Sequence, residues 1–395
     1  MRRHILGQLG AAGLLALCPP LRAASRPATP VTVALTAEFG LRDSTSAQAI
    51  ELGLRLAIRE VNAAGGVLGG RPLQLITRDD RSMPARAMRN FEEFLQVPDL
   101  IAVFGGKFSP VLLELEPLAR RANVPLMAAW ASADPVTGGG REHGHVFRLA
   151  PRDSWAIEVM ARHLRRGRGC RALGLLVPNT AWGRSSMEAL RMLAAASGTP
   201  YRVEWYSWGE RTLLPHYRTL LAAGMDGLIA VANERETALL LRELAALPAA
   251  QRVAVAAHSG ATGGDLFAMA GAALGAVDLA IVQAFTFGGA ATAQKRRMLQ
   301  LLSAQSLPFP VTRVSSAGFA QAYDLMQLLA RALGQAGSTD RTRLREALEH
   351  LPPHAGLIKT YARPFAPDRH DALSPQDIFM AGFTKDGRLV RLEER

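Results

Sequence analysis

The sequence predicts an α/β protein of two lobes, each built on a parallel sheet, and three observations support this. First, 395 residues are too many for one ordinary core and fit two domains of typical size. Second, short β-branched segments alternate with amphipathic helices from residue 31 onward. Third, the alternation stops in the glycine-rich stretch Asp134–His145 and restarts beyond Pro151. With 49% hydrophobic and 20% charged residues, the chain has a globular composition.

The first lobe begins with a β-branched run, Val31–Thr36, which Phe39 and Gly40 end. The next segment, Ser46–Ala63, repeats apolar residues at helical spacing until Gly65 stops it. Because strands joined by helices of this length favour a parallel sheet covered on both faces, we expect that arrangement here. The other elements expected in this lobe are strands at 72–77, 100–104 and 125–129 and helices at 84–95 and 110–122.

The second lobe repeats the same alternation, and the chain ends in a hairpin. A tight Asp386–Gly387 turn joins two short strands, Phe379–Phe383 and Leu389–Leu392. The strands expected before the hairpin lie at 172–177, 201–206, 227–232, 252–257 and 279–285. The helices expected in this lobe lie at 154–165, 184–196, 213–223 and 235–246. Further along the chain, helices are expected at 291–304, 315–333 and 340–351.

The first residues predict export. Arg2 and Arg3 precede an apolar run, Ile5–Leu17, that is too short to span a bilayer as a helix, and the small residues Ala23–Ser25 follow it. This is the layout of a secretory signal, so we expect residues 1–25 to be a signal peptide. The arginine pair leaves the Sec and twin-arginine routes both open.

The two cysteines predict no internal disulfide. Cys18 follows an apolar stretch that resembles a lipoprotein cleavage box, but Leu17 stands where such a box needs a small residue. Lipid anchoring at Cys18 therefore stays an alternative to a free chain. If Cys18 leaves with the signal peptide, Cys170 is the only thiol, and core packing must hold the fold together.

The net charge of +12 comes almost wholly from arginines scattered along the chain. The block Arg165–Arg168 lacks the interleaved aromatic residues on which nucleic-acid surfaces stack bases, so we interpret it as a solvated face and expect no nucleic-acid partner. A positive field helps to attract an anionic solute.

The motifs of several enzyme classes are missing. The chain has neither a Gly-x-Ser-x-Gly elbow nor a phosphate-binding Gly-x-x-x-x-Gly-Lys-Ser/Thr loop. The glycines of Gly65–Gly70 follow a helix and precede a strand, the reverse of a dinucleotide fingerprint. His143 and His145 have no obvious third ligand. We therefore expect no enzyme activity, no cofactor and no metal.

Four local motifs follow one another along the chain. They are the stretch Ala57–Leu73 followed by Asp79–Asp80, the loop Phe104–Ser109, the segment Asn123–Met127 with Ala131–Ala133 behind it, and the helical Ala320–Asp324. In order, spacing and sense they resemble the type I periplasmic binding proteins, and within these the leucine/isoleucine/valine-binding branch. The resemblance covers nearly the whole chain after the leader.

The resemblance implies two Rossmann-like lobes joined by a three-strand hinge. By it the crossovers, the segments that pass between the lobes, fall near 148–152, 281–285 and 356–361. The first lobe then holds residues 30–150 and 284–357, and the second holds 151–283 and 358–395.

The resemblance also implies a function. Such a protein is a periplasmic solute-binding protein that closes its cleft on a small molecule and delivers it to the inner-membrane permease of an ABC importer, and the family default is a monomer. The expected solute is a small polar or carboxylate-bearing molecule, either amino-acid-like or an organic acid. A periplasmic sensor that signals to a partner protein is the first alternative, and an exported enzyme is the second.

In open parallel sheets, ligands sit beyond the carboxyl ends of the strands, where helix N-termini favour an anionic head. In the first lobe this places the site in two loops, one with Phe108 and Ser109 and one with Trp130, Ala131, Ser132 and Ala133. The alternatives are that Ser109 only caps its helix and that Trp130 belongs to the core.

In the second lobe the resemblance implies that Trp182 covers the solute and that Asn233 and Glu234 contact it. The alternatives are that Trp182 packs under its own loop and that His258 is a satisfied histidine at a strand end instead of a donor to the head group. His258 and Ser259 follow a further strand, at a point where amino-acid-binding relatives usually carry an acid for the solute ammonium. The missing acid favours a carboxylate or amide solute without that amine, because an unpaired buried ammonium is costly. The cluster Trp205, Tyr206 and Trp208 is expected to pack at the lobe surface instead of forming a ligand cage.

Overall fold

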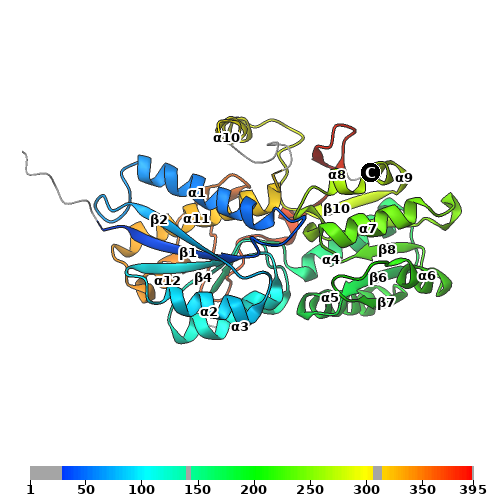
Figure 1. Cartoon of the computed structure of the whole chain (residues 1–395), viewed down its shortest axis with the longest axis horizontal. Helices are drawn as coiled ribbons and strands as arrows, with labels where there is room; N and C mark the ends of the chain where they lie inside the picture. The colour runs from blue at the N-terminus through cyan, green and yellow to red at the C-terminus, as the bar shows by residue number, and fades with distance from the viewer. Residues whose placement is uncertain (1–28, 139–143, 306–313, 394–395) are drawn as a thin grey trace, which may run out of the picture.

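The computed structural model describes residues 29–138, 144–305 and 314–393 and shows two lobes along its longest axis (Figure 1). The expected signal peptide, Cys18 and His143 lie outside these residues. In the described part of the chain, no helix is long and apolar enough to cross a membrane.

The first lobe is built on a five-stranded parallel sheet in the order β2-β1-β3-β4-β5. Strand β1 is buried on both faces, with Val33 and Leu35 in one core layer and Ala34 in the other. The strands are β1 (Val31–Ala37), β2 (Leu73–Asp79), β3 (Leu100–Gly105), β4 (Leu126–Ala128) and β5 (Val146–Arg148).

Helices cover both faces of this sheet. One layer holds α1 (Ser46–Ala63), α11 (Ser316–Ala336) and α12 (Arg341–Glu349), and α2 (Pro84–Phe94) and α3 (Ser109–Arg121) lie on the opposite face (Figure 1). Helices α1 and α11 approach closely because Gly53 has no side chain: a Cβ there would lie 2.4 Å from the carbonyl oxygen of Phe319. Helix α10 (Ala293–Ser303) packs on this layer through Met298 and Leu302.

The second lobe is built on a seven-stranded sheet in the order β14-β13-β10-β9-β8-β6-β7. Its last two strands are antiparallel and form the expected hairpin, which turns at Gly387 with a φ of 81°. The strands are β6 (Leu173–Pro178), β7 (Tyr201–Tyr206), β8 (Gly227–Ala230), β9 (Ala254–Ala257), β10 (Leu279–Gln283), β13 (Phe379–Phe383) and β14 (Leu389–Arg391). The helices are α4 (Asp153–Arg162), α5 (Ala181–Ser197), α6 (Leu214–Ala222), α7 (Glu234–Ala245), α8 (Leu266–Ala270) and α9 (Ala273–Ala276).

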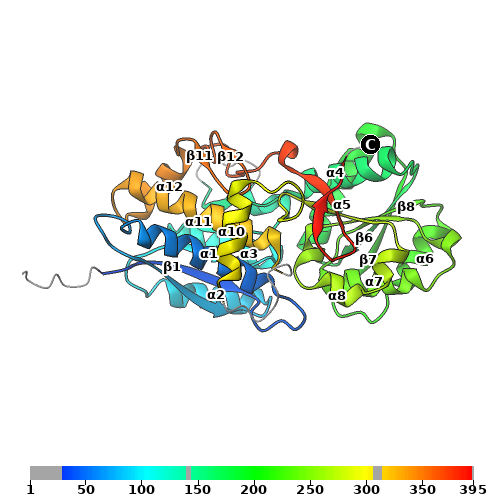
Figure 2. The ribbon, with the colours of Figure 1, turned by 90° about the horizontal axis from the view of Figure 1, so that it is seen from above.

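Three segments pass between the lobes. The first follows β5, and the second follows β10, since Gln283 ends a strand of the second sheet whereas Phe285 packs in the first core. Figure 2 shows the red C-terminal strands lying against the second lobe. The two-lobed α/β fold predicted from the sequence is thus confirmed.

The third passage lies later than 356–361. The short hairpin of β11 (His354–Ala355) and β12 (Thr360–Tyr361) belongs to the first lobe, where Tyr361 and Leu373 are core residues. Ile378 is the next residue buried in the second core, so the chain crosses at 374–378. Residues 358–373, expected in the second lobe, therefore pack with the first. The apolar residues of this irregular segment follow no helix or strand period, so the sequence does not show with which lobe the segment packs.

Candidate functional site

A small cavity of about 10 Å³ lies between the lobes. This is room for about one water molecule, so the lobes are closed upon each other. The described residues that line it come from both lobes: Lys107, Phe108, Ser109, Pro110, Trp130, Ser132, Trp182, Trp208, Asn233, His258 and Gly260.

The first-lobe wall is the N-terminus of α3, where backbone N–H groups and the helix dipole favour an anion. Ser109 does not cap this helix. Its Oγ instead accepts a hydrogen bond from the backbone N–H of Ala133 at 3.2 Å, which ties α3 to the loop that carries Ser132. The Ser109 side chain is buried, and its hydroxyl proton remains available for donation.

The second-lobe wall is formed by Trp182 and His258. Thr180 caps α5, and Gly183 allows its first turn to approach β6 closely, because a Cβ there would lie 1.9 Å from the carbonyl oxygen of Pro178. The Trp182 indole N–H donates to the buried Asp153 carboxylate at 3.1 Å. The Trp182 ring meets the His258 ring edge to face, with 5.1 Å between centroids.

Three more aromatic rings complete the cavity. Trp130 is buried in the first core against α11, where a Cβ at Gly318 would lie 2.4 Å from its ring, and it also faces the cavity. Trp208 reaches across from the second lobe and packs edge to face on Phe108 at 5.1 Å. The prediction that Trp208 packs only at the lobe surface is therefore wrong. Its neighbour Trp205 is 36% exposed.

A buried ion pair joins the lobes beside the cavity. The Lys107 ammonium lies 2.9 and 2.6 Å from the two carboxylate oxygens of Glu234, with 2% and 3% of the two side chains exposed. A third hydrogen bond runs from Lys107 to Ser44 Oγ at 3.2 Å. The backbone N–H of Thr45 donates to the carbonyl of Gly263 at 2.8 Å and closes the same side of the cleft.

Two further acids lie near this ion pair. Burial raises the pKa of the Glu38 carboxyl, although the Lys107 charge partly opposes the rise. Glu38 accepts a short hydrogen bond from Ser46. Burial also raises the pKa of Glu236, and the neighbouring Glu234 charge adds to the rise. Both groups are therefore more readily protonated than ordinary glutamates.

The predicted site residues divide into two sets. Phe108, Ser109, Trp130, Ser132, Trp182, Asn233 and His258 line the cavity. Glu234 lies beside it in the ion pair, whereas Ala131 and Ala133 are core residues of the first lobe and Ser259 is buried behind His258. Lys107 and Trp208 were not predicted. Lys107 belongs to the loop Phe104–Ser109, one of the four motifs that resemble the family. Its place in that loop was the sequence signal for a role at the site.

Ser259, His258 and Asp153 form a chain of buried polar groups. Ser259 Oγ lies 3.3 Å from His258 Nδ1, and His258 Nε2 lies 3.3 Å from an Asp153 carboxylate oxygen. The second contact lacks hydrogen-bond geometry, and Ser259 does not line the cavity. Among the described residues, no three His, Cys, Asp or Glu side chains cluster as metal ligands.

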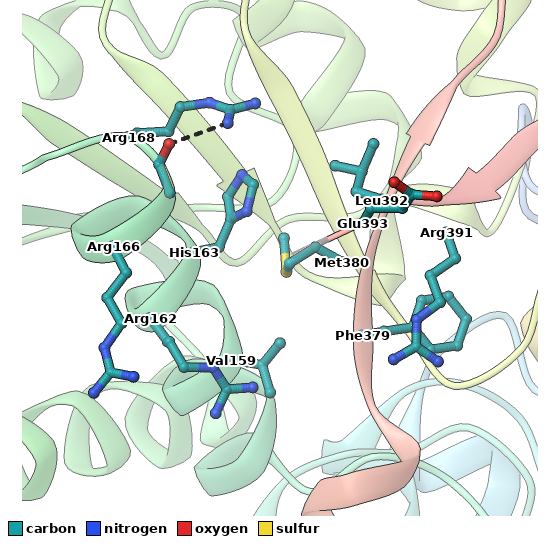
Figure 3. Close-up of a pocket in the computed structure, with 11 residues that line it drawn as sticks. Val159, Arg162, His163, Arg166, Arg168, Phe379, Met380, Arg391, Leu392 and Glu393 are labelled. Atoms are coloured by element: carbon teal, nitrogen blue, oxygen red, sulfur yellow. Dashed lines mark hydrogen bonds between the residues drawn. The ribbon is translucent and has the colours of Figure 1, made fainter. Parts of the chain in front are cut away.

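A larger groove of about 770 Å³ lies on the second lobe (Figure 3), and it shares no described lining residue with the cavity between the lobes. One wall is α4 and the π-helical turn η2 (His163–Gly167), and the other is the C-terminal hairpin. Its cations are partly engaged, since Arg168 pairs with Asp278 at 2.5 Å and Arg391 stacks on Phe379. Arg165 and Arg166 are exposed, as expected of a solvated face.

A family model described as periplasmic binding protein matches residues 30–388. A curated relative, Leu/Ile/Val-binding protein homolog 8 of Brucella abortus (strain 2308), is 31% identical over 99 residues, which are 25% of this chain and 24% of the relative. The match thus spans about a quarter of that relative's length.

Three solved structures share the fold. A periplasmic binding protein type 1 from Bordetella pertussis Tohama I has a TM-score of 0.80 at 20% identity and covers 92% of this chain and 100% of its own. The branched-chain amino acid substrate-binding protein LivJ from Streptococcus pneumoniae, in complex with isoleucine, has 0.76 at 17% identity, with 92% and 100% covered. A Rhodopseudomonas palustris solute-binding protein in complex with benzoate has 0.76 at 17% identity, with 92% and 95% covered. The chain belongs to the periplasmic binding protein family and has the two-lobed type I fold.

Proposed function

We propose that the protein is a periplasmic solute-binding protein of an ABC importer and that its solute is a small carboxylate with a planar, apolar body. The observation that carries the proposal is the cavity lining. Phe108, Trp130, Trp182 and Trp208 supply four aromatic rings, and the N-terminus of α3 supplies an anion-binding end. Aromatic faces and edges suit a flat apolar body, and the helix end suits a carboxylate.

The charges beside the cavity disfavour a free amino acid. Although Glu234 places an acid near the cleft, both of its oxygens are hydrogen-bonded to Lys107. Glu236, the next acid on α7, has a raised pKa and so a weakened tendency to be charged. As long as Lys107 holds both oxygens of Glu234, a solute ammonium finds no free carboxylate among the described lining residues, and burying it unpaired is costly.

Proteins of this fold are found with an amino acid and with an aromatic carboxylate as the solute. LivJ from Streptococcus pneumoniae is in complex with isoleucine, and the Rhodopseudomonas palustris protein is in complex with benzoate. The aromatic cavity of this chain supports the second kind. Because the closed cavity holds about one water, entry requires the lobes to part about the three crossovers and to close again.

A thermal-shift panel on the chain without residues 1–25 tests the proposal, since a ligand that binds the folded state raises the melting temperature. The panel holds amino acids, aliphatic and aromatic carboxylates, amides and short polyols. The proposal expects a rise with aromatic carboxylates and none with amino acids. A rise with branched amino acids alone would contradict it.

Two other outputs remain on the same fold, a periplasmic sensor and an exported enzyme. A sensor would bind the same solute as the binding protein of an importer. These two functions are separated by whether the closed protein stimulates the ATPase activity of a reconstituted permease. The chain of Ser259, His258 and Asp153 is the feature that favours an enzyme. Saturable ester hydrolysis that Ser259→Ala abolishes is the result that would establish it.

A further inference from the structure

Every donor of the Lys107 ammonium is in use. Two hydrogen bonds go to the carboxylate oxygens of Glu234 and one goes to Ser44 Oγ. A lysine ammonium has three N–H donors. A solute carboxylate can therefore bind Lys107 only by replacing one of these partners.

The two partners differ in the lobe to which they belong. Ser44 and Lys107 both belong to the first lobe. Ser44 lies just before α1, and Lys107 follows β3. Glu234 begins α7 in the second lobe. Parting of the lobes therefore removes Glu234 and leaves Lys107 on Ser44, beside the N-terminus of α3. Among the described cavity-lining residues, Lys107 is also the only lysine or arginine.

We propose that Lys107 receives the carboxylate of the solute and that Glu234 is a competitor, attached to the opposite lobe, for the same ammonium. The inference rests on the proposed function and adds to it the residue that recognises the head group. The solute gains Lys107 by displacing Glu234, so the affinity measured for a carboxylate is reduced by the strength of the internal ion pair.

The surroundings of the Lys107–Glu234 ion pair favour its formation when the cleft closes without a solute. The ion pair is buried, and a buried charge that loses its partner is strongly disfavoured. Gly263 packs directly on the pair, since a Cβ there would lie 2.5 Å from both the Lys107 nitrogen and a Glu234 oxygen. Closure without a solute thus reforms this contact and leaves little room for anything else.

The test measures benzoate binding by calorimetry to the chain without residues 1–25 and to three variants. Glu234→Gln removes the competing charge while keeping the shape, and we expect it to bind benzoate about ten- to a hundredfold more tightly, as expected when a competing closed state is removed. The matched control is Glu236→Gln, a buried glutamate on the same helical turn without a hydrogen bond to Lys107, for which we expect a change of less than about threefold.

The double variant Lys107→Met/Glu234→Met separates recognition from a simple latch. Replacing a buried ion pair by apolar side chains commonly preserves folding, so this variant stays informative if a single change unfolds the lobe. We expect it to bind no benzoate. Equal or tighter binding by the double variant would show that the pair only holds the lobes together.

The remaining outcomes of the benzoate titrations also decide whether the inference stands. Equal or weaker benzoate binding by Glu234→Gln than by the wild type would overturn the inference and leave the proposed function standing. Absence of binding in both the wild type and Glu234→Gln, for benzoate and for the other aromatic carboxylates of the panel, would overturn the inference together with the proposed function.

Discussion

The indole N–H of Trp182 donates to the carboxylate of Asp153 over 3.1 Å, and Asp153 is the first residue of α4, directly beyond the first crossover. The backbone N–H of Asp153 in turn donates to the carbonyl of Ser132, a cavity residue of the first lobe. The aromatic wall of the second lobe is therefore held from the hinge, so its position follows the angle between the lobes.

Trp182→Ala should weaken carboxylate binding at least tenfold, which is about 1.4 kcal/mol, because it removes a ring from the cavity. The affinity of Trp182→Phe should lie between those of Trp182→Ala and the wild type, since this variant keeps a ring but loses the donor to Asp153. Calorimetric titration with benzoate measures both. Trp205→Ala is the matched control at an exposed tryptophan, and an equal loss there would contradict the mapping of the cleft.

Ser109→Ala should weaken binding and lower the free energy of unfolding by about 1–3 kcal/mol, because the buried Ala133 N–H is left without its acceptor. The variant also loses a hydroxyl at the anion-binding end of α3. Binding and urea unfolding measured on the same preparation separate the two effects. Unchanged affinity would show that the head group does not reach this helix end.

Trp130→Ala should mainly destabilise the protein. Its ring is 3% exposed and packs against α11, so we expect the free energy of unfolding to fall by about 3–5 kcal/mol. Urea denaturation followed by circular dichroism measures this fall. A loss of solute binding at unchanged stability would instead assign Trp130 to the solute alone.

The buried pair of Arg148 and Asp371 should matter far more than a surface pair. It spans 2.6 Å and links the first crossover to the segment that leads into the third. Asp371→Asn leaves a buried guanidinium without its counter-charge and should cost about 3–5 kcal/mol. The exposed pair of Arg55 and Glu51 is the control, and Glu51→Gln should cost less than about 1 kcal/mol. Similar losses would show that the hinge pair is solvated.

Asp80 should make stability fall as the pH rises. Burial, aided by the Glu38 charge, raises its pKa from 3.8 to about 7. Between about pH 4 and pH 7 the folded state therefore holds a proton that the unfolded chain has lost, so the free energy of unfolding declines across this window. Asp80→Asn removes this decline. Unfolding measured at several pH values should give a flatter curve for the variant, and parallel curves would contradict the shift.

Most of the architecture could be predicted because its signal is periodic. The helix Ser46–Ala63 repeats apolar residues at helical spacing, and strands such as Val31–Ala37 are short runs buried on both faces, which is the pattern of a parallel sheet covered on both sides. Residues 358–373 carry no such period, and the ion pair of Arg148 with Asp371 joins positions far apart in the sequence. The third crossover was therefore misplaced.

The site could be predicted as strand ends but not as contacts across the cleft. Ser109 and His258 follow strands, so topology alone brings them to one edge of each sheet. Lys107 and Trp208 gain their roles only when the lobes meet, through Glu234 and Phe108. Asp153 looks like an ordinary acid at a helix start until its bond to Trp182 is seen. The contacts across the cleft depend on the interlobe angle, which no local pattern encodes.

The most direct test of the central claim is calorimetric titration of benzoate and of isoleucine into the chain without residues 1–25, beside the double variant Ser109→Ala/Trp182→Ala. The account predicts one benzoate per chain with a dissociation constant on the order of micromolar, about 8 kcal/mol of binding free energy. It also predicts no heat with isoleucine and loss of benzoate binding in the variant. Binding of isoleucine without benzoate, or benzoate binding that survives both substitutions, would contradict it.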